Sequence, residues 1–358
     1  MRAQNSTETA LAGDWKIEPA TDQDAAAWDA YVQATLGSNF YQAYGWRSVN
    51  RGHFRHETPY LLARTVPDGA ICGVLPLVMI RSRLFGNILS SMPFVNFGGL
   101  TAANPAVAHD LLDRAALLAR ELGADYTELR LLRPLDDALP TALHKVSMSI
   151  ALDADPDRLW NAFTSKHRTN IRRVYKNAIE VQQGGRELLD AFYDLLSQSW
   201  RRLGTPIYAK GYFADILRQF PEQTRIFLAL HEGTPIATAF NGYFQDTVEG
   251  MWAGTAPEYQ KLQPNYVLYW EMIKHACESG YRHFHLGRSS VDSNAEQFKK
   301  KWNAEAQQLY WQYLLNKSQE IPQLNVNNPK FKLAIAAWQR LPLRVTQLLG
   351  PGLARSIP

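Results

Sequence analysis

Two stretches of the chain concentrate residue types that bind anions. The first, HLGRSSVDSNAEQFKKKW (285–302), runs from a strand-like beginning through a Gly-Arg-Ser-Ser turn into three consecutive lysines. Arg288 and Lys299 bring positive charge, while Gly287 and Ser289 bring backbone and hydroxyl groups into the same turn. A solvated helix end would explain this composition. A cradle for a negatively charged substrate explains it better if the rest of the chain supplies a matching surface.

The second stretch, SKHRTNIRRVYKNA (165–178), holds five Lys or Arg residues and no acidic one. Arg168 and Arg172 are four positions apart and therefore share a face of the expected helix. Arginine forks fit phosphate oxygens. Because solvated helix faces usually mix both signs, we interpret Lys166, Arg168 and Arg172 as candidate phosphate-binding residues, with a plain solvated face as the alternative.

A third candidate lies where a strand ending in WAG leads into a helix expected from Asn265 to Ser279. The start of a helix is a natural anion site, so Asn265 and Tyr266 are candidate binding residues. No glycine occurs between Gly254 and Gly280. This counts against the Gly-x-Gly turn that often cradles the diphosphate of coenzyme A, although not against acyl transfer.

Other chemistries have weaker support. The nine histidines show no HExxH pattern, and the two cysteines show no CxxC spacing, so we expect no metal site and no disulfide framework. The Gly-Arg-Ser-Ser turn lacks the GxSxG elbow of serine hydrolases. His283 or His285 could supply a base, but strand alternation makes one of them a core-facing residue. Weak candidates for a general base are Asp292, Tyr266 and Glu271.

The elements that position these residues occur twice in one order. A hairpin at Pro67-Asp68-Gly69 is followed by a helix to about Leu122 and a strand, and a hairpin at Glu232-Gly233 is followed by a helix to Ser279 and a strand. The repeated order, β-α-α-β-β-β-α-β, predicts an α/β fold (a mixed sheet of the α+β kind) in two copies. The expected division is a disordered leader (1–13), a first domain (14–150), a second domain (151–320) and a tail (321–358).

The tail carries five basic residues and no acidic one, with Ile335, Trp338, Leu341, Val345 and Leu348 at helical spacing. This pattern predicts an amphipathic helix that Pro342 kinks or divides. It either packs on the body of the protein or lies on an anionic membrane surface. No apolar run is long enough to span a bilayer, and the first residues lack the apolar core of a signal peptide, so we expect a cytoplasmic protein.

At this point the motifs resemble a known family. HLGRSSVDSNAEQFKKKWNAE with LYWQYLL, SKHRTNIRRVYKNAIEV and SSMPFVNFGGL are similar to the motifs of FemAB-like proteins, particularly those associated with exosortase/PEP-CTERM systems. The resemblance covers roughly residues 15–315. It implies two tandem GNAT-like acyl-CoA N-acyltransferase domains with a ligand cleft between or beside them.

The resemblance also implies roles for particular residues. The family's Phe-Lys pair falls on Phe298 and Lys299, which makes Lys299 the candidate for stabilising phosphate or developing negative charge. The family's basic helix falls on residues 166–176, with Arg168 as the best-matched member. Two departures stand out: Asn303 replaces the usual glycine after the Trp, and the chain lacks the coiled-coil arm of several peptidoglycan-directed members.

The expected function is therefore an acyl- or aminoacyltransferase that modifies a cell-envelope or exopolysaccharide precursor by direct transfer. The catalytic candidates are Lys299, Arg288 and Asp292. The co-substrate would be an activated acyl donor (acyl-CoA, acyl carrier protein or aminoacyl-tRNA, the last less favoured), with no tightly bound cofactor. The alternative is a non-catalytic module that holds a lipid-linked diphosphate or RNA for a partner in envelope biosynthesis.

Overall fold

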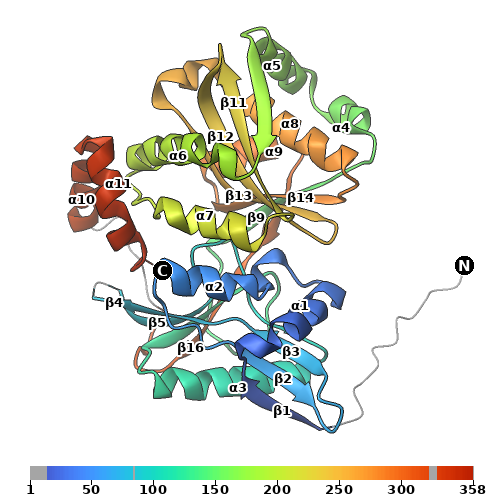
Figure 1. Cartoon of the computed structure of the whole chain (residues 1–358), viewed down its shortest axis with the longest axis vertical. Helices are drawn as coiled ribbons and strands as arrows, with labels where there is room; N and C mark the ends of the chain where they lie inside the picture. Colours follow the sequence, from blue (N-terminus) through green and yellow to red (C-terminus); the bar gives the residue numbers. More distant parts are fainter. Residues whose placement is uncertain (1–13, 84, 322–328, 358) are drawn as a thin grey trace, which may run out of the picture.

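The computed structural model describes residues 14–83, 85–321 and 329–357, which form two stacked lobes (Figure 1). Each lobe layers helices on β-sheets and contains one mixed sheet. The order β-α-α-β-β-β-α-β expected from the sequence is found over residues 179–290, whereas the first half has five strands instead of three between its second and third α-helices. The leader expected at residues 1–13 lies outside the described residues.

The lower lobe in Figure 1 contains two sheets and is built mainly from the first half of the chain. The four-stranded sheet has the order β1 (Trp15–Pro19), β2 (Leu61–Thr65), β3 (Ile71–Leu75) and β6 (Thr101–Ala102). The five-stranded sheet has the order β4 (Val78–Ser82), β5 (Gly86–Ser91), β7 (Tyr126–Leu131), β16 (Tyr310–Leu315) and β8 (Thr141–Ala142).

The helices of this lobe are α1 (Ala25–Ala34), α2 (Gly45–Gly52) and α3 (Pro105–Glu121). The apolar run 70–83, which follows the expected turn at residues 67–69, breaks at Pro76 into β3 and β4, which belong to different sheets. Proline cannot donate a ladder hydrogen bond, which explains the break. The Asn104 side chain caps α3 by accepting a hydrogen bond from the Val107 N–H at 2.9 Å.

The upper lobe has one seven-stranded sheet. Its order is β10 (Ile179–Gly184), β11 (Thr224–His231), β12 (Thr234–Phe244), β13 (Thr247–Thr255), β14 (His283–Ser290), β9 (Lys145–Ala151) and β15 (Glu305–Gln308). Its helices are α4 (Pro156–Ala162), α5 (Ser165–Tyr175), α6 (Leu189–Leu203), α7 (Lys210–Gln219), α8 (Asn265–Glu278) and α9 (Asn294–Lys300).

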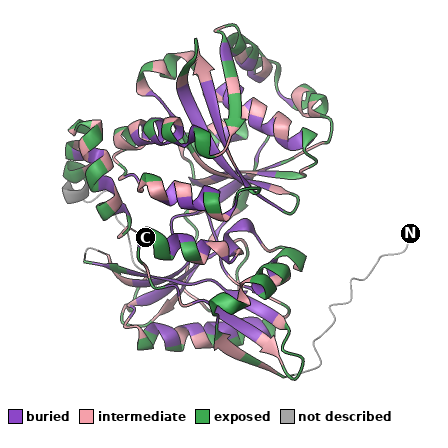
Figure 2. Cartoon of the chain, in the orientation of Figure 1, coloured by how far each residue is buried: buried purple, intermediate pink, exposed green. Residues whose placement is uncertain are grey.

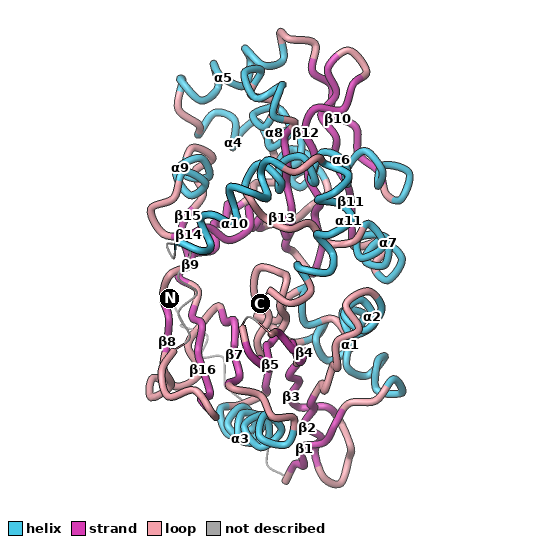
Figure 3. Tube along the Cα trace, turned by 90° about the vertical axis from the view of Figure 1, so that its left-hand side faces the viewer, coloured by secondary structure: helices cyan, strands magenta, loops and turns pink. Residues whose placement is uncertain are grey.

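Alternating strand residues separate the two faces of this sheet. Ile226 and Leu228 belong to the core cluster that contains α6, whereas Phe227 and Ala229 belong to the cluster that contains α8. Since successive side chains of a strand point to opposite faces, α6 and α8 cover opposite sides of the sheet (Figure 3).

The two lobes exchange strands. β9 pairs with β14 and β15 of the upper sheet, whereas β16, from the end of the second half, pairs with β7 and β8 of the lower sheet. The expected boundary at residue 150 therefore falls inside β9. The lobes also share one core cluster, which contains Trp28, Tyr41 and Phe97 of the first half together with Phe192 and Phe240 of the second. The sheets are accordingly buried through most of their length in both lobes (Figure 2).

The tail forms α10 (Pro329–Arg340) and α11 (Leu343–Ala354), divided at Pro342 as expected. Both helices pack beside α6, with Trp338 buried and the Arg201 side chain donating a hydrogen bond to the Leu341 carbonyl at 3.0 Å. Within the described residues, no helix combines the length and the apolar character needed to cross a membrane.

Candidate functional site

A gap opens where β13 and β14 separate. The two strands pair in parallel over three residue pairs only, from Thr247–His283 to Glu249–His285. On its other side, β13 carries one extra residue, Met251, opposite the step from Phe240 to Asn241 of β12. Such a bulge bends a strand and re-aims its side chains.

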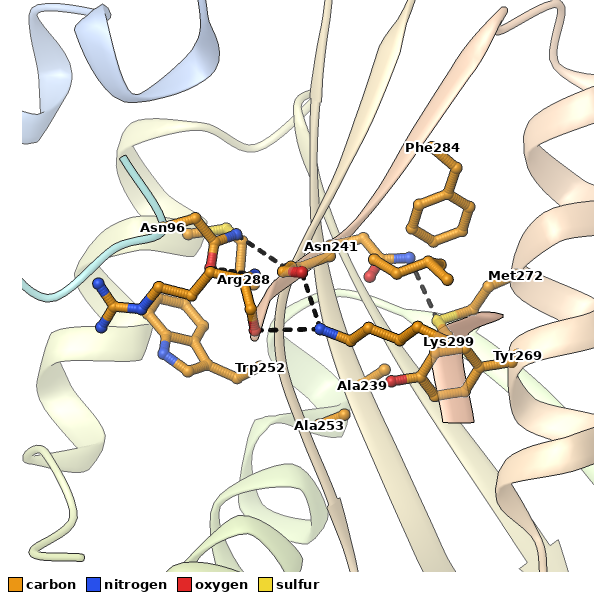
Figure 4. A pocket seen from close by; sticks show the side chains of 14 residues that line it. Asn96, Ala239, Asn241, Trp252, Ala253, Tyr269, Met272, Phe284, Arg288 and Lys299 are labelled. Carbon is orange, nitrogen blue, oxygen red and sulfur yellow. Dashed lines mark hydrogen bonds between the residues drawn. The ribbon is translucent and has the colours of Figure 1, made fainter. Parts of the chain in front are cut away.

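A cavity of about 190 Å³ lies in this gap (Figure 4). It is lined by Asn96, Ala239, Asn241, Gly250, Met251, Trp252, Ala253, Tyr269, Met272, Phe284, Leu286, Gly287, Arg288 and Lys299. Of the residues expected from the sequence, it brings together Gly287, Arg288 and Lys299.

Lys299 is the buried lysine of the three. Its side chain comes from α9, which Ser293 caps by accepting a hydrogen bond from the Glu296 N–H. The Lys299 ammonium donates to the Gly287 carbonyl at 2.7 Å and to the Arg288 carbonyl at 3.1 Å. Burial, and next the charge of Arg288, lower the pKa of Lys299 to about 7.

The neighbours of Lys299 differ from it. Phe298, which we expected to point inward, is only half-buried and lines a second cavity. Lys300 is exposed and pairs with Glu296 at 2.7 Å, whereas Lys301, also exposed, lines the second cavity with Phe298. One helical turn therefore gives the three lysines three different environments.

Gly287 permits a close approach of β14 to β13. Its φ is +78°, and a Cβ atom at this position would lie 2.8 Å from the Gly250 carbonyl oxygen. Only glycine fits both conditions without moving the backbone. The same turn leaves the Gly287 carbonyl as an acceptor for Lys299.

A buried polar network closes the cavity on the side of the lower lobe. Asn96 donates to the Gly250 carbonyl at 3.1 Å and to the Tyr41 hydroxyl at 2.9 Å, and it accepts from the Arg288 N–H at 3.4 Å. Glu249 lies 2.8 Å from His285 Nδ1. Burial alone would lower the pKa of His285, but the carboxylate of Glu249 outweighs it and raises this pKa above its usual value. The Glu249 carboxylate thus favours the protonated form of His285.

A second cavity, of about 460 Å³, lies at the start of α8 and shares Ala253 and Tyr269 with the first. It is lined by Ser199, Arg202, Ala253, Gly254, Thr255, Gln260, Gln263, Pro264, Asn265, Tyr266, Tyr269, Phe298 and Lys301. The Asn265 side chain accepts from the Thr255 hydroxyl at 2.9 Å.

The first backbone N–H groups of α8 are not free to bind an anion. The Tyr266 and Val267 N–H groups already donate to the carbonyls of Gln263 and Pro264, both at 3.1 Å. This agrees with the missing Gly-x-Gly turn. Positive charge in this cavity comes instead from the side chains of Arg202 and Lys301.

The basic helix expected to bind phosphate is α5, and its arginines contact α4. Arg168 donates to the carbonyls of Asn161 at 2.8 Å and Phe163 at 3.0 Å, and Arg172 lies over the ring of Trp160 at 5.2 Å. Lys166 is exposed, and none of the three lines either cavity. These contacts give Arg168 and Arg172 a structural role at the end of α4.

The remaining candidates lie apart from Lys299. Asp292 is exposed in a turn with φ +60° and lines neither cavity, so its geometry does not favour a catalytic role. Ser289 is buried, and its hydroxyl has no partner among the described residues. Tyr266 is buried with its hydroxyl 3.5 Å from Asn170 Nδ2, and Glu271 accepts from the Tyr175 hydroxyl. Across the described part of the chain, no group of three or more His, Cys, Asp or Glu side chains could hold a metal ion.

Several site residues were missed from the sequence. Asn96 stands in the SSMPFVNFGGL motif, which carried a signal, but the motif alone does not show that its amide reaches the other lobe. Asn241 and Trp252 lie in strands whose sequence looks like ordinary core, as does Glu249, which contacts His285. Only the bulge and the separation of β13 from β14 bring Asn241 and Trp252 to the cavity.

With this geometry in place, comparisons with known proteins become informative. Residues 165–300, which lie in the upper lobe, match the model of the acetyltransferase (GNAT) domain family. No curated protein sequence matches the chain.

Three solved structures resemble the whole chain. A crystal structure of FemX superposes with a TM-score of 0.64 at 15% identity, covering 84% of this chain and 98% of its own. The C-terminal domain of a putative lysylphosphatidylglycerol synthetase from Agrobacterium fabrum gives 0.55 at 12% identity, with coverages of 88% and 94%. A tandem GNAT protein from the clavulanic acid biosynthesis pathway gives 0.54 at 11% identity, with coverages of 84% and 98%. At these identities the likeness concerns the fold, and the expected tandem GNAT-like fold is confirmed.

Proposed function

We propose that the chain is an acyl- or aminoacyltransferase that modifies a cell-envelope or exopolysaccharide precursor by direct transfer from an activated donor. The observation that carries this proposal is the buried Lys299 amine at the gap between β13 and β14, beside a larger cavity that shares two lining residues with it. The GNAT domain match over residues 165–300 supports the reaction class.

In the proposed reaction, the acyl carbon lies in the gap. An amine or hydroxyl of the acceptor forms a bond to this carbon while the bond to the donor's sulfur or oxygen breaks, and the acceptor proton leaves with solvent or with the departing donor. The carbonyl oxygen carries negative charge in between. The Lys299 ammonium, held by two backbone carbonyls, stabilises that charge, and the cavity walls orient both substrates.

The donor enters from the second cavity. Acyl-CoA, acyl carrier protein and aminoacyl-tRNA all carry phosphate, which Arg202 and Lys301 suit by charge. Because the first amides of α8 are already bonded within the turn, side chains rather than backbone N–H groups would hold this phosphate. Asn265 and Tyr266 line the path.

The acceptor assignment has two kinds of support. The first is the fold that this chain shares with the FemX and lysylphosphatidylglycerol synthetase structures. What those names say about substrates applies to those two proteins. The association with exosortase/PEP-CTERM systems rests on the sequence resemblance.

The tail supports a peripheral position at the cytoplasmic face of the membrane. The tail exposes Leu333 (73%), Leu348 (79%) and Leu353 (45%). Arg340 and Arg344 of the tail are also exposed. Exposed leucines beside arginines suit the surface of an anionic membrane. The tail would thus combine packing on the body with contact to lipid.

The test of the reaction is transfer in vitro. Purified protein is incubated with acetyl-CoA or with aminoacyl-tRNA and an envelope extract, and labelled acyl groups are followed into the extract. Protein-dependent labelling supports a transferase. Stoichiometric binding of the extract's lipid-linked diphosphates or of RNA, without labelling from either donor, would instead support the non-catalytic module.

A further inference from the structure

A second group of cationic side chains lies at the five-stranded sheet of the lower lobe. Arg130 of β7 is 1% exposed, and its Nε donates to Glu128 Oε1 at 2.7 Å. Its Nη1 and Nη2 atoms are buried and have no hydrogen-bond partner among the described residues. Buried polar groups are normally satisfied, so these donors require an explanation.

Glu128 does not supply the missing acceptors. Its Oε1 also accepts from the Ser90 hydroxyl at 3.4 Å, and its Oε2 lies 3.5 Å from the Tyr313 hydroxyl. The carboxylate is therefore shared among three side chains of one sheet, and Arg130 reaches it through Nε alone.

Arg288 brings a second guanidinium from the upper lobe to the same place. Its side chain points away from Lys299 (Figure 4) and lies over the Trp311 ring at 5.6 Å, while Arg130 lies over that ring at 4.4 Å. The Nη1 atom of Arg288 is buried and unpartnered among the described residues. Burial, and next the charge of Arg130, lower the pKa of Arg288 to about 10.

A further cation, Lys145, lies nearby, whereas the surroundings favour the neutral form of the neighbouring His144. Lys145 donates to the Ser290 hydroxyl at 2.7 Å, and His144 stacks edge-on against Trp311 at 4.7 Å. Burial lowers the pKa of both groups, and the charges of Arg288 and Arg130 lower them further. Glu128 neutralises one of the two guanidiniums, and Arg288 has no ion-pair partner among the described residues. An excess of positive charge beside a buried ion pair is costly unless an anion joins it.

We propose that Arg130 and Arg288 form a receptor for an oxyanion, a carboxylate or phosphate, carried by the acceptor substrate. Both guanidiniums lie over the Trp311 ring, and their buried Nη groups without partners among the described residues are donors that such an anion accepts. Arg288 also lines the Lys299 cavity, so an anion bound here tethers the acceptor beside the reacting carbon. That the ligand is the acceptor rests on the transfer reaction proposed above; the anion site itself does not.

The experiment measures anion binding without turnover. The full chain is titrated calorimetrically with inorganic phosphate and, separately, with acetate at constant ionic strength. The test variant is the double substitution Glu128→Gln/Arg130→Gln, which removes both members of the buried pair and so leaves no lone charge. The matched control is Arg120→Gln, an exposed arginine on α3.

We expect wild type and the Arg120→Gln variant to bind at least one anion, and the double variant to bind it at least tenfold more weakly. The anion that binds distinguishes phosphate from carboxylate. Equal binding by all three proteins, or no binding of either anion by wild type, would overturn the proposal. If the double variant fails to fold by circular dichroism, Arg288→Gln, whose residue is partly exposed, takes its place under the same criteria.

A labelling assay separates this inference from the proposed function. Anion binding that depends on Arg130, in a protein without transfer activity, would keep the site and reject the reaction. Transfer that survives unchanged in the double variant, with an unchanged KM for the acceptor, would keep the reaction and reject the acceptor role of the site.

Discussion

At the scale of single residues, the account depends on the unequal environments of the three consecutive lysines. Lys299 is 8% exposed and bonded to two backbone carbonyls, whereas Lys300 forms a salt bridge on the surface. Phe298 is half-buried against the core of the upper lobe, and Lys299 is more deeply buried. The sequence could not show this burial of Lys299, because the carbonyls that receive its ammonium become available only after β14 turns at Gly287.

The lowered pKa of Lys299 predicts a pH-dependent stability. In the unfolded chain this amine titrates at its ordinary value near 10.4, so between pH 7 and 10 the unfolded state binds a proton that the folded state lacks. The cost of the buried charge is therefore fully present below pH 7 and is relieved as the pH rises. Relative to Lys299→Met, the unfolding free energy of wild type should rise by up to about 1.4 kcal/mol per pH unit between pH 7 and 9.

Urea unfolding of the two proteins at pH 6, 7, 8 and 9 measures this difference. Taking the difference between wild type and Lys299→Met at each pH removes the contributions of the titrating groups that the two proteins share. Parallel stability curves for the two proteins would show that Lys299 keeps an ordinary pKa in the fold.

At the scale of elements, the site depends on the path of β14 beside β13, and Gly287 permits the close approach of the two strands at Gly250. Gly287→Ala would combine a left-handed backbone with a Cβ atom 2.8 Å from the Gly250 carbonyl. Gly280→Ala is the matched control, since Gly280 has a φ of +82° and a Cβ atom added there would meet nothing within 4 Å. We expect the control to lose about 1 kcal/mol of stability and Gly287→Ala about 2–4 kcal/mol.

Urea midpoints at constant m-value provide the comparison, with labelling assays for transfer. The Gly287 variant should also lose most of its activity, whereas the Gly280 variant keeps it. Equal losses of stability in the two variants would mean that the close approach of β14 to Gly250 does not constrain the site.

The elements themselves were largely predictable, but their partners were not. Turn residues such as Pro67-Asp68-Gly69 and Glu232-Gly233, and the cap residues Asn104 and Ser293, act locally and can be recognised in sequence. The all-basic face of α5 was visible too, but its charge density did not show that Arg168 would bond the carbonyls at the end of α4. In the same way, nothing near Arg130 in the sequence indicates that Arg288 lies over the same tryptophan.

At the scale of the whole molecule, the exchange of β9 and β16 makes the lobes interdependent. A fragment of residues 151–320 lacks β9, which lies between β14 and β15, and carries β16 without its partners. We expect this fragment to show less folded structure than residues 144–309, which keep β9 and omit β16. Both should be less stable than the full chain because the lobes share a core.

The dispersion of amide signals in NMR spectra measures how much folded structure each of the two fragments and the full chain has. A well-dispersed spectrum from residues 151–320, equal to that of residues 144–309, would show that the strand exchange contributes little to folding.

The tail belongs to the same scale, since its leucines matter only if the molecule meets a membrane. We expect the protein to float with vesicles that contain phosphatidylglycerol, and the Leu348→Ser/Leu353→Ser variant to float less. Leu36→Ser is the matched control, because Leu36 is 98% exposed in the first half. Flotation that persists after truncation at Pro322 would exclude the tail as the membrane contact.

The central claim, acyl transfer at Lys299, is tested most directly by mass spectrometry of envelope and polysaccharide extracts from cells that express wild type, Lys299→Gln or no protein. Removal of a donor that stabilises an oxyanion commonly costs about 10²–10³ in kcat. The account predicts one acyl or aminoacyl mass increment with wild type, and its near-complete loss with Lys299→Gln at equal amounts of folded protein. An increment of equal abundance with Lys299→Gln, or identical extracts with and without the wild-type protein, would contradict it.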